Sequence, residues 1–294
     1  MATAVLLVAS CRDDTAKPTT APEGSVTVAS FDFEESQLLA EIYAQALEDE
    51  GIEVRRQLNL GPRELVLPAL RQGLVDVVPE YAGSVLEATA PDVPLDRSDL
   101  AAVTLALQTA VKPWGITVLR PAAASNQNVL AVRAELAADH ALTAVSDLVS
   151  LAPSMSIGGP PECARRPLCL PGLAGVYGLR FERFVPLAGE QLVRRALADG
   201  VVDVGVLFST DAALAGPELA VLDDDRALQP PDNVLPLVRD DALRDQRVRT
   251  ALEEVSAALT TTSLRFLNWR VAHSGTGSAA EARGWLVRQG LIDR

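Results

Sequence analysis

The pattern of apolar and polar positions along the chain uses one helix–glycine–strand phrase twice, 127 positions apart. The first copy reads ALRQGLVDV from Ala69 and the second reads ALADGVVDV from Ala196, and an aromatic residue follows each copy, Tyr81 and Phe208. In each copy an amphipathic helix ends at a glycine, which readily adopts the left-handed C-cap conformation. The Val-rich strand that follows is apolar enough for burial on both faces, as in a parallel sheet. Chance is the alternative explanation, because this phrase is common in α/β proteins.

The rest of the chain continues the alternation between the two periodicities. Period-two or continuously apolar stretches predict strands, and one-sided apolar stretches predict helices: strands over 25–30, 52–60, 116–119, 129–132 and 234–238, and helices over 36–50, 98–111 and 144–151. Such alternation is typical of a parallel α/β fold. Ligands of open α/β sheets bind beyond the carboxyl ends of the strands, which is where Tyr81 and Phe208 fall.

Two breaks in this pattern divide the chain into lobes. Periodicity is lost at 121–124, and an acidic, Pro-containing segment at 223–231 precedes a strand that we expect to return to the first lobe. We therefore predict a signal and tether over 1–24, a first lobe built from 25–122 and 229–294, and a second lobe over 123–228. Two lobes joined by two crossings form a hinge, and hinged lobes close around ligands.

Composition narrows the classes of partner. The 294 residues suffice for two α/β domains, and 48% hydrophobic with 22% charged residues is an ordinary globular content. The net charge is −13, and no stretch gathers Lys and Arg into a patch. This argues against nucleic acid, which needs clustered cations, and against a folded domain lying on anionic lipid.

The first cysteine predicts a membrane anchor. Cys11 follows an apolar run over 6–10 that ends in small residues, which is the pattern of a bacterial lipoprotein signal, although no basic residue precedes it. The polar, Pro- and Thr-rich segment after Cys11 is typical of a flexible tether. No stretch approaches the roughly 20 apolar residues of a spanning helix. We expect an extracytoplasmic protein, held on the outer face of the cell membrane through the lipid on Cys11.

The other two cysteines lie six positions apart in a Pro-rich loop. In an exported chain, Cys163 and Cys169 are expected to form a local disulfide that fixes this loop. A metal pair and a catalytic thiol are the alternatives. The two histidines, His140 and His273, lie far from the loop in sequence, and no ligand spacing typical of zinc occurs.

Several short stretches together carry a resemblance to a known family: SFDFEESQ (30–37), AEIY (40–43), PEYAGS (79–84), RPLCLPGL (166–173), VYGL (176–179) and FSTD (208–211). They resemble, in this order, the osmoprotectant (glycine betaine, choline and carnitine) binding proteins of ABC transporters, in particular lipoproteins of the actinobacterial type. The resemblance covers about residue 25 to the C-terminus. It implies the type II periplasmic binding protein fold, with two α/β lobes joined by a two-crossing hinge. It also implies a monomer without enzymatic activity or cofactor, whose partners are a small-molecule solute, a membrane permease and its ATPase.

The resemblance also implies a set of ligand-binding residues. In that family a quaternary ammonium lies in a box of aromatic rings, because a cation without N–H donors gains from ring quadrupoles and apolar contact. The residues at positions that match the family's site, with an arginine for a ligand carboxylate, are Tyr81, Ser84, Asn126, Asn128, Arg166, Tyr177 and Phe208. We add Phe31, Phe33 and Ser36, which lie at a strand end and a helix N-terminus, a natural place for polar ligand groups.

Two departures from the family pattern leave the ligand open. Asn128 stands where betaine binders carry an aromatic ring, and Asn126 stands where an acidic residue is common. An amide-rich box favours hydrogen bonding over cation binding, so another polar or aromatic solute is an alternative. A sensing protein on the same fold is a second alternative. An enzyme would need a nucleophile–base pair or a metal centre, and neither is evident.

Overall fold

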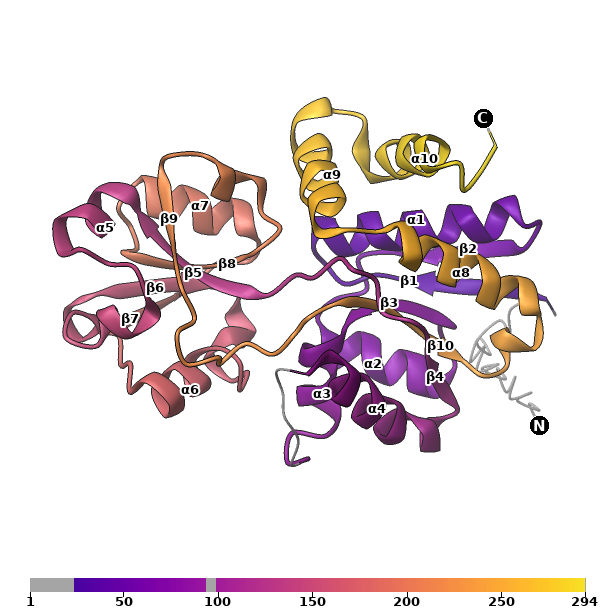
Figure 1. The fold of residues 1–294 in the computed structure, drawn as a ribbon, viewed down its shortest axis with the longest axis horizontal. Helices are drawn as coiled ribbons and strands as arrows, with labels where there is room; N and C mark the ends of the chain where they lie inside the picture. The colour runs from indigo at the N-terminus through magenta and orange to yellow at the C-terminus, as the bar shows by residue number, and fades with distance from the viewer. Residues whose placement is uncertain (1–23, 94–98, 294) are drawn as a thin grey trace, which may run out of the picture.

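Two five-stranded sheets, one in each lobe, organise the residues that the computed structural model describes, 24–93 and 99–293 (Figure 1). The first sheet has the order β2-β1-β3-β10-β4, with β1 at Ser25–Ala29, β2 at Glu53–Gln57, β3 at Val77–Tyr81, β4 at Ile116–Val118 and β10 at Val234–Arg239. The second has the order β7-β6-β8-β5-β9, with β5 at Asn128–Arg133, β6 at Ser156–Gly159, β7 at Arg183–Pro186, β8 at Val204–Phe208 and β9 at Leu219–Leu222. The two α/β lobes of the expected fold are therefore present.

The sheets are mixed, so the prediction of parallel strands throughout is wrong for one strand in each lobe. β10 runs antiparallel to β3 and β4, and β5 runs antiparallel to β8 and β9. Both are the strands through which the chain enters a lobe from the other one. They start at the edge where the parallel strands end, so they must run the opposite way. β10 belongs to the first sheet, as its expected return requires.

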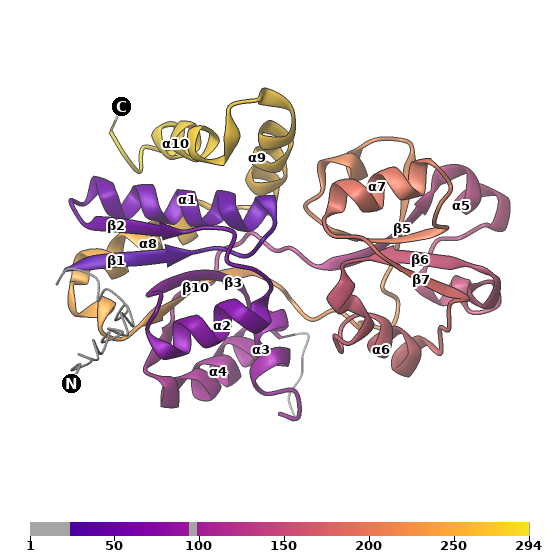
Figure 2. The same ribbon diagram turned by 180° about the vertical axis from the view of Figure 1, so that it is seen from behind.

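Helices cover both faces of each sheet (Figures 1 and 2). Those of the first lobe are α1 at Glu34–Asp49, α2 at Arg63–Gln72, α3 at Ala82–Thr89, α4 at Leu100–Val111, α8 at Gln246–Ala258, α9 at Thr261–Ser274 and α10 at Gly277–Gln289. Those of the second are α5 at Ala134–His140, α6 at Leu170–Gly172 and α7 at Glu190–Ala198. α1 is the most buried of these, because its apolar positions pack on β1 and β3 while its other sides contact α8 and α10.

One predicted helix is absent. The segment 144–151 forms a short 3₁₀ turn, Val145–Leu148, followed by a second at Ala152–Ser154. The carboxylate of Asp147 accepts the backbone N–H groups of Thr143 and Ala144 at 2.9 Å each, which holds the chain in a tight turn. Pro153 then prevents an α-helix from continuing through this point.

The repeated phrase builds the same unit in both lobes. α2 ends at Gly73 (φ +73°) and α7 is followed by Gly200 (φ +70°), both left-handed as expected. β3 and β8 follow, and each is the third of five strands in its sheet. The aspartate before each strand accepts a backbone N–H from the neighbouring strand at 2.8 Å, Asp76 from Thr27 and Asp203 from Ser156.

Two crossing segments, 119–127 and 223–233, join the lobes (Figure 1). They are hydrogen-bonded to each other like a short antiparallel ribbon. Val234 N–H donates to Ala124 O and Asn126 N–H to Asp232 O, both at 2.9 Å. In the described ranges 24–93 and 99–293, no helix is long and apolar enough to cross a membrane. Cys11 and the predicted signal lie outside these ranges.

Candidate ligand-binding site

A cavity of about 510 Å³ lies between the lobes, at the carboxyl ends of β3 and β8. We call it the central cavity. The first lobe lines it with the β1–α1 junction, the start of α2 and one face of α3, and the second lobe with β5, β8 and the Pro-rich disulfide loop. The ends of β3 and β8, the two strands of the repeated phrase, thus open onto the same space.

Four aromatic rings form one side of the central cavity. Phe33 is at their centre, with ring centroids at 5.8 Å from Phe31, 6.3 Å from Tyr81 and 5.5 Å from Phe208. Phe31 and Tyr81 are buried, whereas Phe33 and Phe208 are partly exposed toward the cavity they line. Ring faces of this kind attract a cation that carries no hydrogen-bond donor.

Behind this wall a buried carboxylate gathers four polar groups. Glu35 Oε1 accepts from the Tyr81 hydroxyl at 2.7 Å and the Asn126 amide at 2.6 Å, and Oε2 accepts from Thr210 Oγ1 and Asn268 Nδ2 at 2.5 Å each. These donors come from β3, the first crossing, the segment after β8 and α9. Burial and the Glu35 charge raise the pKa of Tyr81 well above its ordinary value, so its hydroxyl stays a donor. Glu35 therefore fixes the ring of Tyr81 and ties the two lobes together.

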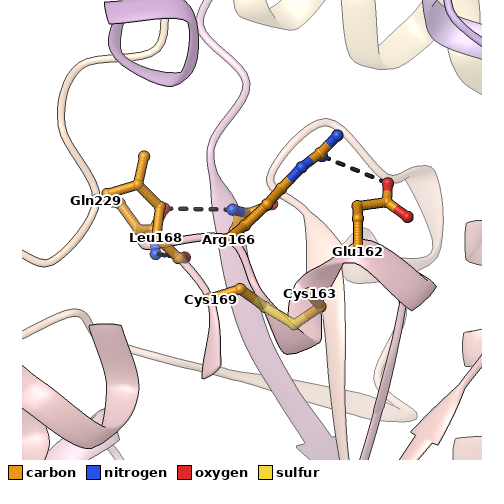
Figure 3. The surroundings of a disulfide bond; sticks show 7 residues. Glu162, Cys163, Arg166, Leu168, Cys169 and Gln229 are labelled. Carbon is orange, nitrogen blue, oxygen red and sulfur yellow. Dashed lines mark hydrogen bonds and ion pairs between the residues drawn. A yellow bond between two sulfur atoms is a disulfide. The ribbon is translucent and has the colours of Figure 1, made fainter. Parts of the chain in front are cut away.

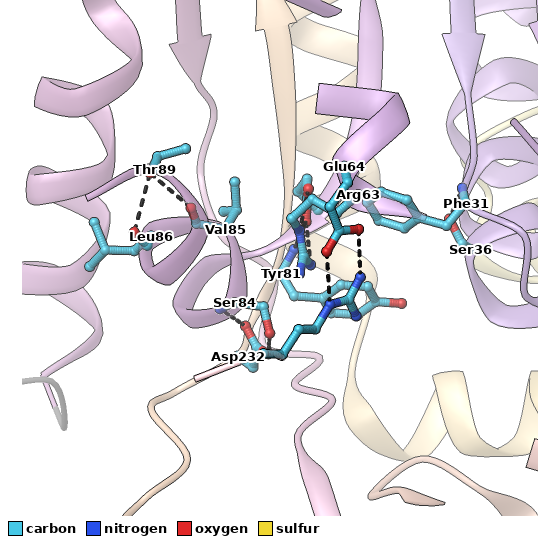
Figure 4. A network of polar contacts seen from close by, with 12 residues as sticks. Phe31, Ser36, Arg63, Glu64, Tyr81, Ser84, Val85, Leu86, Thr89 and Asp232 are labelled. Atoms are coloured by element: carbon cyan, nitrogen blue, oxygen red, sulfur yellow. Dashed lines mark hydrogen bonds and ion pairs between the residues drawn. The ribbon is translucent and has the colours of Figure 1, made fainter. Parts of the chain in front are cut away.

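A second polar group, only partly exposed, lies at the start of α2. The Arg63 guanidinium makes two hydrogen bonds of 2.9 Å to the carboxylate of Glu80, and its Cζ lies 5.4 Å from the ring centroid of Phe31 (Figure 4). Arg63 thus supports the aromatic wall while its charge is matched by Glu80.

Asp232, in the second crossing, is the third polar group that supports the site. Its carboxylate accepts the backbone N–H of Ser84 at 2.9 Å and the Ser84 hydroxyl at 2.5 Å (Figure 4). Burial raises the pKa of Asp232 to about 6, and the bonds from Ser84 compensate for part of that rise.

The predicted disulfide is present and shapes the opposite wall. Cys163 and Cys169 are bonded, with their Cα atoms 5.2 Å apart, and they enclose the turn that carries Arg166 (Figure 3). Arg166 pairs with Glu162 in its own loop at 3.4 Å and with Glu64 of α2 at 3.1 Å. The second pair spans the two lobes. No group of three His, Cys, Asp or Glu side chains that could hold a metal occurs among the described residues.

Most of the predicted site residues meet in one place. Those that line the central cavity are Phe31, Phe33, Tyr81, Ser84, Asn126, Asn128, Arg166 and Phe208. Ser36 does not line it, because its hydroxyl turns back to accept the N–H of Phe31 at 2.9 Å (Figure 4).

Tyr177 does not line the central cavity either. It belongs to a smaller cavity of about 210 Å³ in the second lobe, next to Asp224. Its ring is buried in the core of that lobe. Its hydroxyl donates to the Asp224 carboxylate and accepts the N–H of Arg226 at 2.8 Å. The Tyr177 hydroxyl is therefore already satisfied by its own lobe.

The polar groups that hold the site were not among the residues predicted from the sequence: Glu35, Arg63, Glu80, Thr210, Asp232 and Asn268. Glu35, Glu80 and Thr210 lie inside the stretches that carry the family resemblance, which was an available signal. Asp232 follows two prolines in a crossing segment, and no local pattern marks it as a site residue.

One known protein family and several known relatives match most of this chain. The family described as the substrate binding domain of ABC-type glycine betaine transport systems matches residues 24–288. The chain is 27% identical to the glycine betaine-binding protein YehZ of Escherichia coli K12, over 87% of this chain and 88% of that protein. It is 30% identical to the glycine-betaine-binding protein of Pseudomonas aeruginosa PAO1, with 89% and 86% covered.

Among solved structures, one described as a glycine betaine/carnitine/choline ABC transporter superposes with a TM-score of 0.73. It shares 24% sequence identity, over 92% of this chain and all of that one. This likeness shows the two-lobed fold. The family match covers nearly the whole described chain, and its members are transport proteins rather than enzymes. The chain therefore belongs to the family of substrate-binding domains of ABC-type glycine betaine transport systems.

Proposed function

We propose that this protein is the extracytoplasmic solute-binding component of an ABC importer. It captures a quaternary-ammonium osmoprotectant of the glycine betaine or choline type between its lobes and delivers it to the permease and its ATPase. The observation that carries this proposal is the group of four aromatic rings on one side of the central cavity. The names of the relatives, which bind glycine betaine, support the same ligand class.

The chemistry of the wall fits a methylated ammonium. Such a head has an apolar surface and a delocalised charge, and it cannot donate a hydrogen bond. Phe33 comes from the first lobe and the adjoining Phe208 from the second, so a ligand that rests against both rings contacts both lobes. Contacts with both lobes favour the closed form, which is the form proposed to dock on the permease.

The lipid anchor remains part of the proposal. Cys11 would hold the protein on the outer face of the membrane, and the segment up to Gly24 would act as a tether. Mass spectrometry of the protein extracted from membranes tests this part: a diacylglyceryl modification on Cys11 is the expected result, and an unmodified N-terminus contradicts it.

Calorimetric titration of ligand-free protein with glycine betaine, choline, carnitine, proline betaine and ectoine tests the ligand class. We expect at least one quaternary ammonium to bind, and Phe33→Ala or Tyr81→Ala to weaken binding by about tenfold or more, since a desolvated cation–π contact contributes about 2 kcal/mol. Phe266→Ala is the matched control, because this ring on α9 is 51% exposed and lies outside the central cavity. Binding of a non-ammonium solute, with no response to any ammonium compound, would refute the proposal.

A further inference from the structure

We propose that Asp232 makes this site select solutes of net positive charge over zwitterions that carry the same ammonium head. This inference rests on the proposed function, because it concerns which quaternary ammonium the central cavity prefers. It stands on the position of Asp232, the pairing of the charges around it and the depth at which each charge lies.

Asp232 is held in place by hydrogen bonds from two residues, Ser84 and Asn126. Its side chain is fixed by the two hydrogen bonds from Ser84 at the start of α3, and its carbonyl accepts the N–H of Asn126 from the first crossing. It is 6% exposed and lines the central cavity. The carboxylate is therefore both rigid and adjacent to the ligand space.

No positive side chain within the described residues forms an ion pair with Asp232. Arg63, the cation that acts on it, is engaged by both oxygens of Glu80. A buried carboxylate that receives only neutral hydrogen bonds carries a desolvation cost that an opposite charge in the cavity would offset. The lining of the cavity thus offers an unmatched negative charge.

The positive side chains that line the second-lobe wall are more exposed to solvent than Asp232 is. Arg165 is exposed, and Arg166, 32% exposed, is shared by Glu64 and Glu162. A ligand carboxylate would have to take Arg166 from one of these partners. The central cavity as a whole is lined by five acidic and three basic side chains, so a second negative group is disfavoured there.

A trimethylammonium cation and its zwitterionic counterpart consequently differ in this site. Choline gains the attraction of Asp232 and needs no guanidinium. Glycine betaine gains the same attraction at its head, but its carboxylate adds a second negative charge to the cavity that holds Asp232, and it must compete with Glu64 for Arg166. Charge pairs a few ångströms apart in a partly buried site are worth enough to change affinity by about tenfold or more.

The test is calorimetric titration of choline and of glycine betaine into the ligand-free protein at about pH 7.5 and constant ionic strength. We expect wild type to bind choline more tightly than glycine betaine. Asp232→Asn should weaken choline by about tenfold or more and glycine betaine by less than about threefold, which removes the preference. Asp139→Asn, an exposed change on α5, controls for net charge and should alter neither affinity.

Glu64→Gln supplies a change of the opposite sign. It removes one partner of Arg166, so the affinity for glycine betaine should rise relative to the affinity for choline. If Asp232→Asn weakens both ligands equally, or leaves choline unchanged, the inference is wrong although the proposed function stands. If wild type binds neither compound, the proposed function fails and the inference falls with it.

Titrating the wild-type protein at several pH values tests the role of the Asp232 carboxylate without a variant. The other titratable or charged groups near Asp232 are Arg63, Glu80, Tyr81 and Glu87. As the pH falls from about 7.5 to about 5, Asp232 takes up a proton and choline affinity should fall, more steeply than that of glycine betaine. Equal pH dependence for both ligands would contradict the inference.

Discussion

Replacing Glu35 by glutamine perturbs the point where both lobes and the first crossing meet. A glutamine in the same position keeps one oxygen, which still accepts from Tyr81 and Asn126. Its amide nitrogen faces the other two donors. Thr210 can rotate its hydroxyl and accept a hydrogen bond from this nitrogen, but the side-chain N–H of Asn268 then points at the N–H of the new amide.

The size of the effect follows from these four contacts. A hydrogen bond to a charged group contributes about 1.5–3 kcal/mol and a neutral one about 0.5–1.5 kcal/mol. Glu35→Gln loses one bond and weakens three, while removal of a buried charge offsets part of the loss. We expect a net destabilisation of about 2–4 kcal/mol, which for a chain of this size corresponds to a Tm lowered by about 5–10 °C.

Thermal unfolding followed by circular dichroism measures this change. Glu53→Gln is the matched control, because Glu53 is exposed on the edge strand β2 and the same substitution there should cost less than about 0.5 kcal/mol. In the Glu35→Gln background, Asn268→Ala should cost less than in wild type, because the shared bond is already lost. A Tm for Glu35→Gln equal to that of Glu53→Gln would show that this carboxylate does not hold the lobes together.

Two further predictions concern the first lobe. A Cβ added at Gly83 would lie 2.4 Å from Cγ of Pro230, so Gly83→Ala should destabilise the protein by about 1–3 kcal/mol in urea unfolding. Gly284→Ala in α10 is the control and should be neutral or stabilising. A Gly83→Ala protein as stable as wild type would mean that the second crossing shifts freely. The Arg270 guanidinium, together with smaller contributions from other side-chain hydrogen bonds, holds the pKa of Glu281 at about 2, below its ordinary value of 4.5. The pair therefore stabilises the fold at pH values above 4.5 and loses this effect as the pH falls toward 2. The Tm difference between wild type and Glu281→Gln should therefore shrink on acidification, and a difference independent of pH would exclude this pairing.

How far the sequence predicted the structure depended on the distance over which each feature is encoded. The repeated phrase was confirmed because a helix end, a left-handed glycine and a buried strand are local signals within nine residues. Strand direction was not local: β5 and β10 run antiparallel because of where the crossings enter each sheet. The turn at 143–147 was missed because a side-chain hydrogen bond from Asp147 overrode an apolar pattern typical of a helix.

The same reasoning applies to the site. The strand-end aromatics Tyr81 and Phe208 could be predicted because a general rule places ligands at those ends. Their supports could not. The partners of Glu35 lie 46 to 233 positions away, and the hydroxyl of Ser84 meets an aspartate 148 positions later. Ser36 and Tyr177 have the right residue types, but each is directed to a neighbouring partner rather than to the central cavity.

The paired aspartates before β3 and β8 have a consequence for how this site can change. Asp76 and Asp203 each pin the start of a strand to its neighbour, and Tyr81 and Phe208 each follow five residues later. At about 3.3 Å per residue, both rings therefore lie about 16 Å along the strand from the aspartate that fixes its start. A substitution at either strand end alters the chemistry that one wall offers without moving the wall. The two lobes thus present their binding side chains on strands of equal length. Ligand specificity can change through the residues at the two strand ends, while other elements set the distance between the lobes.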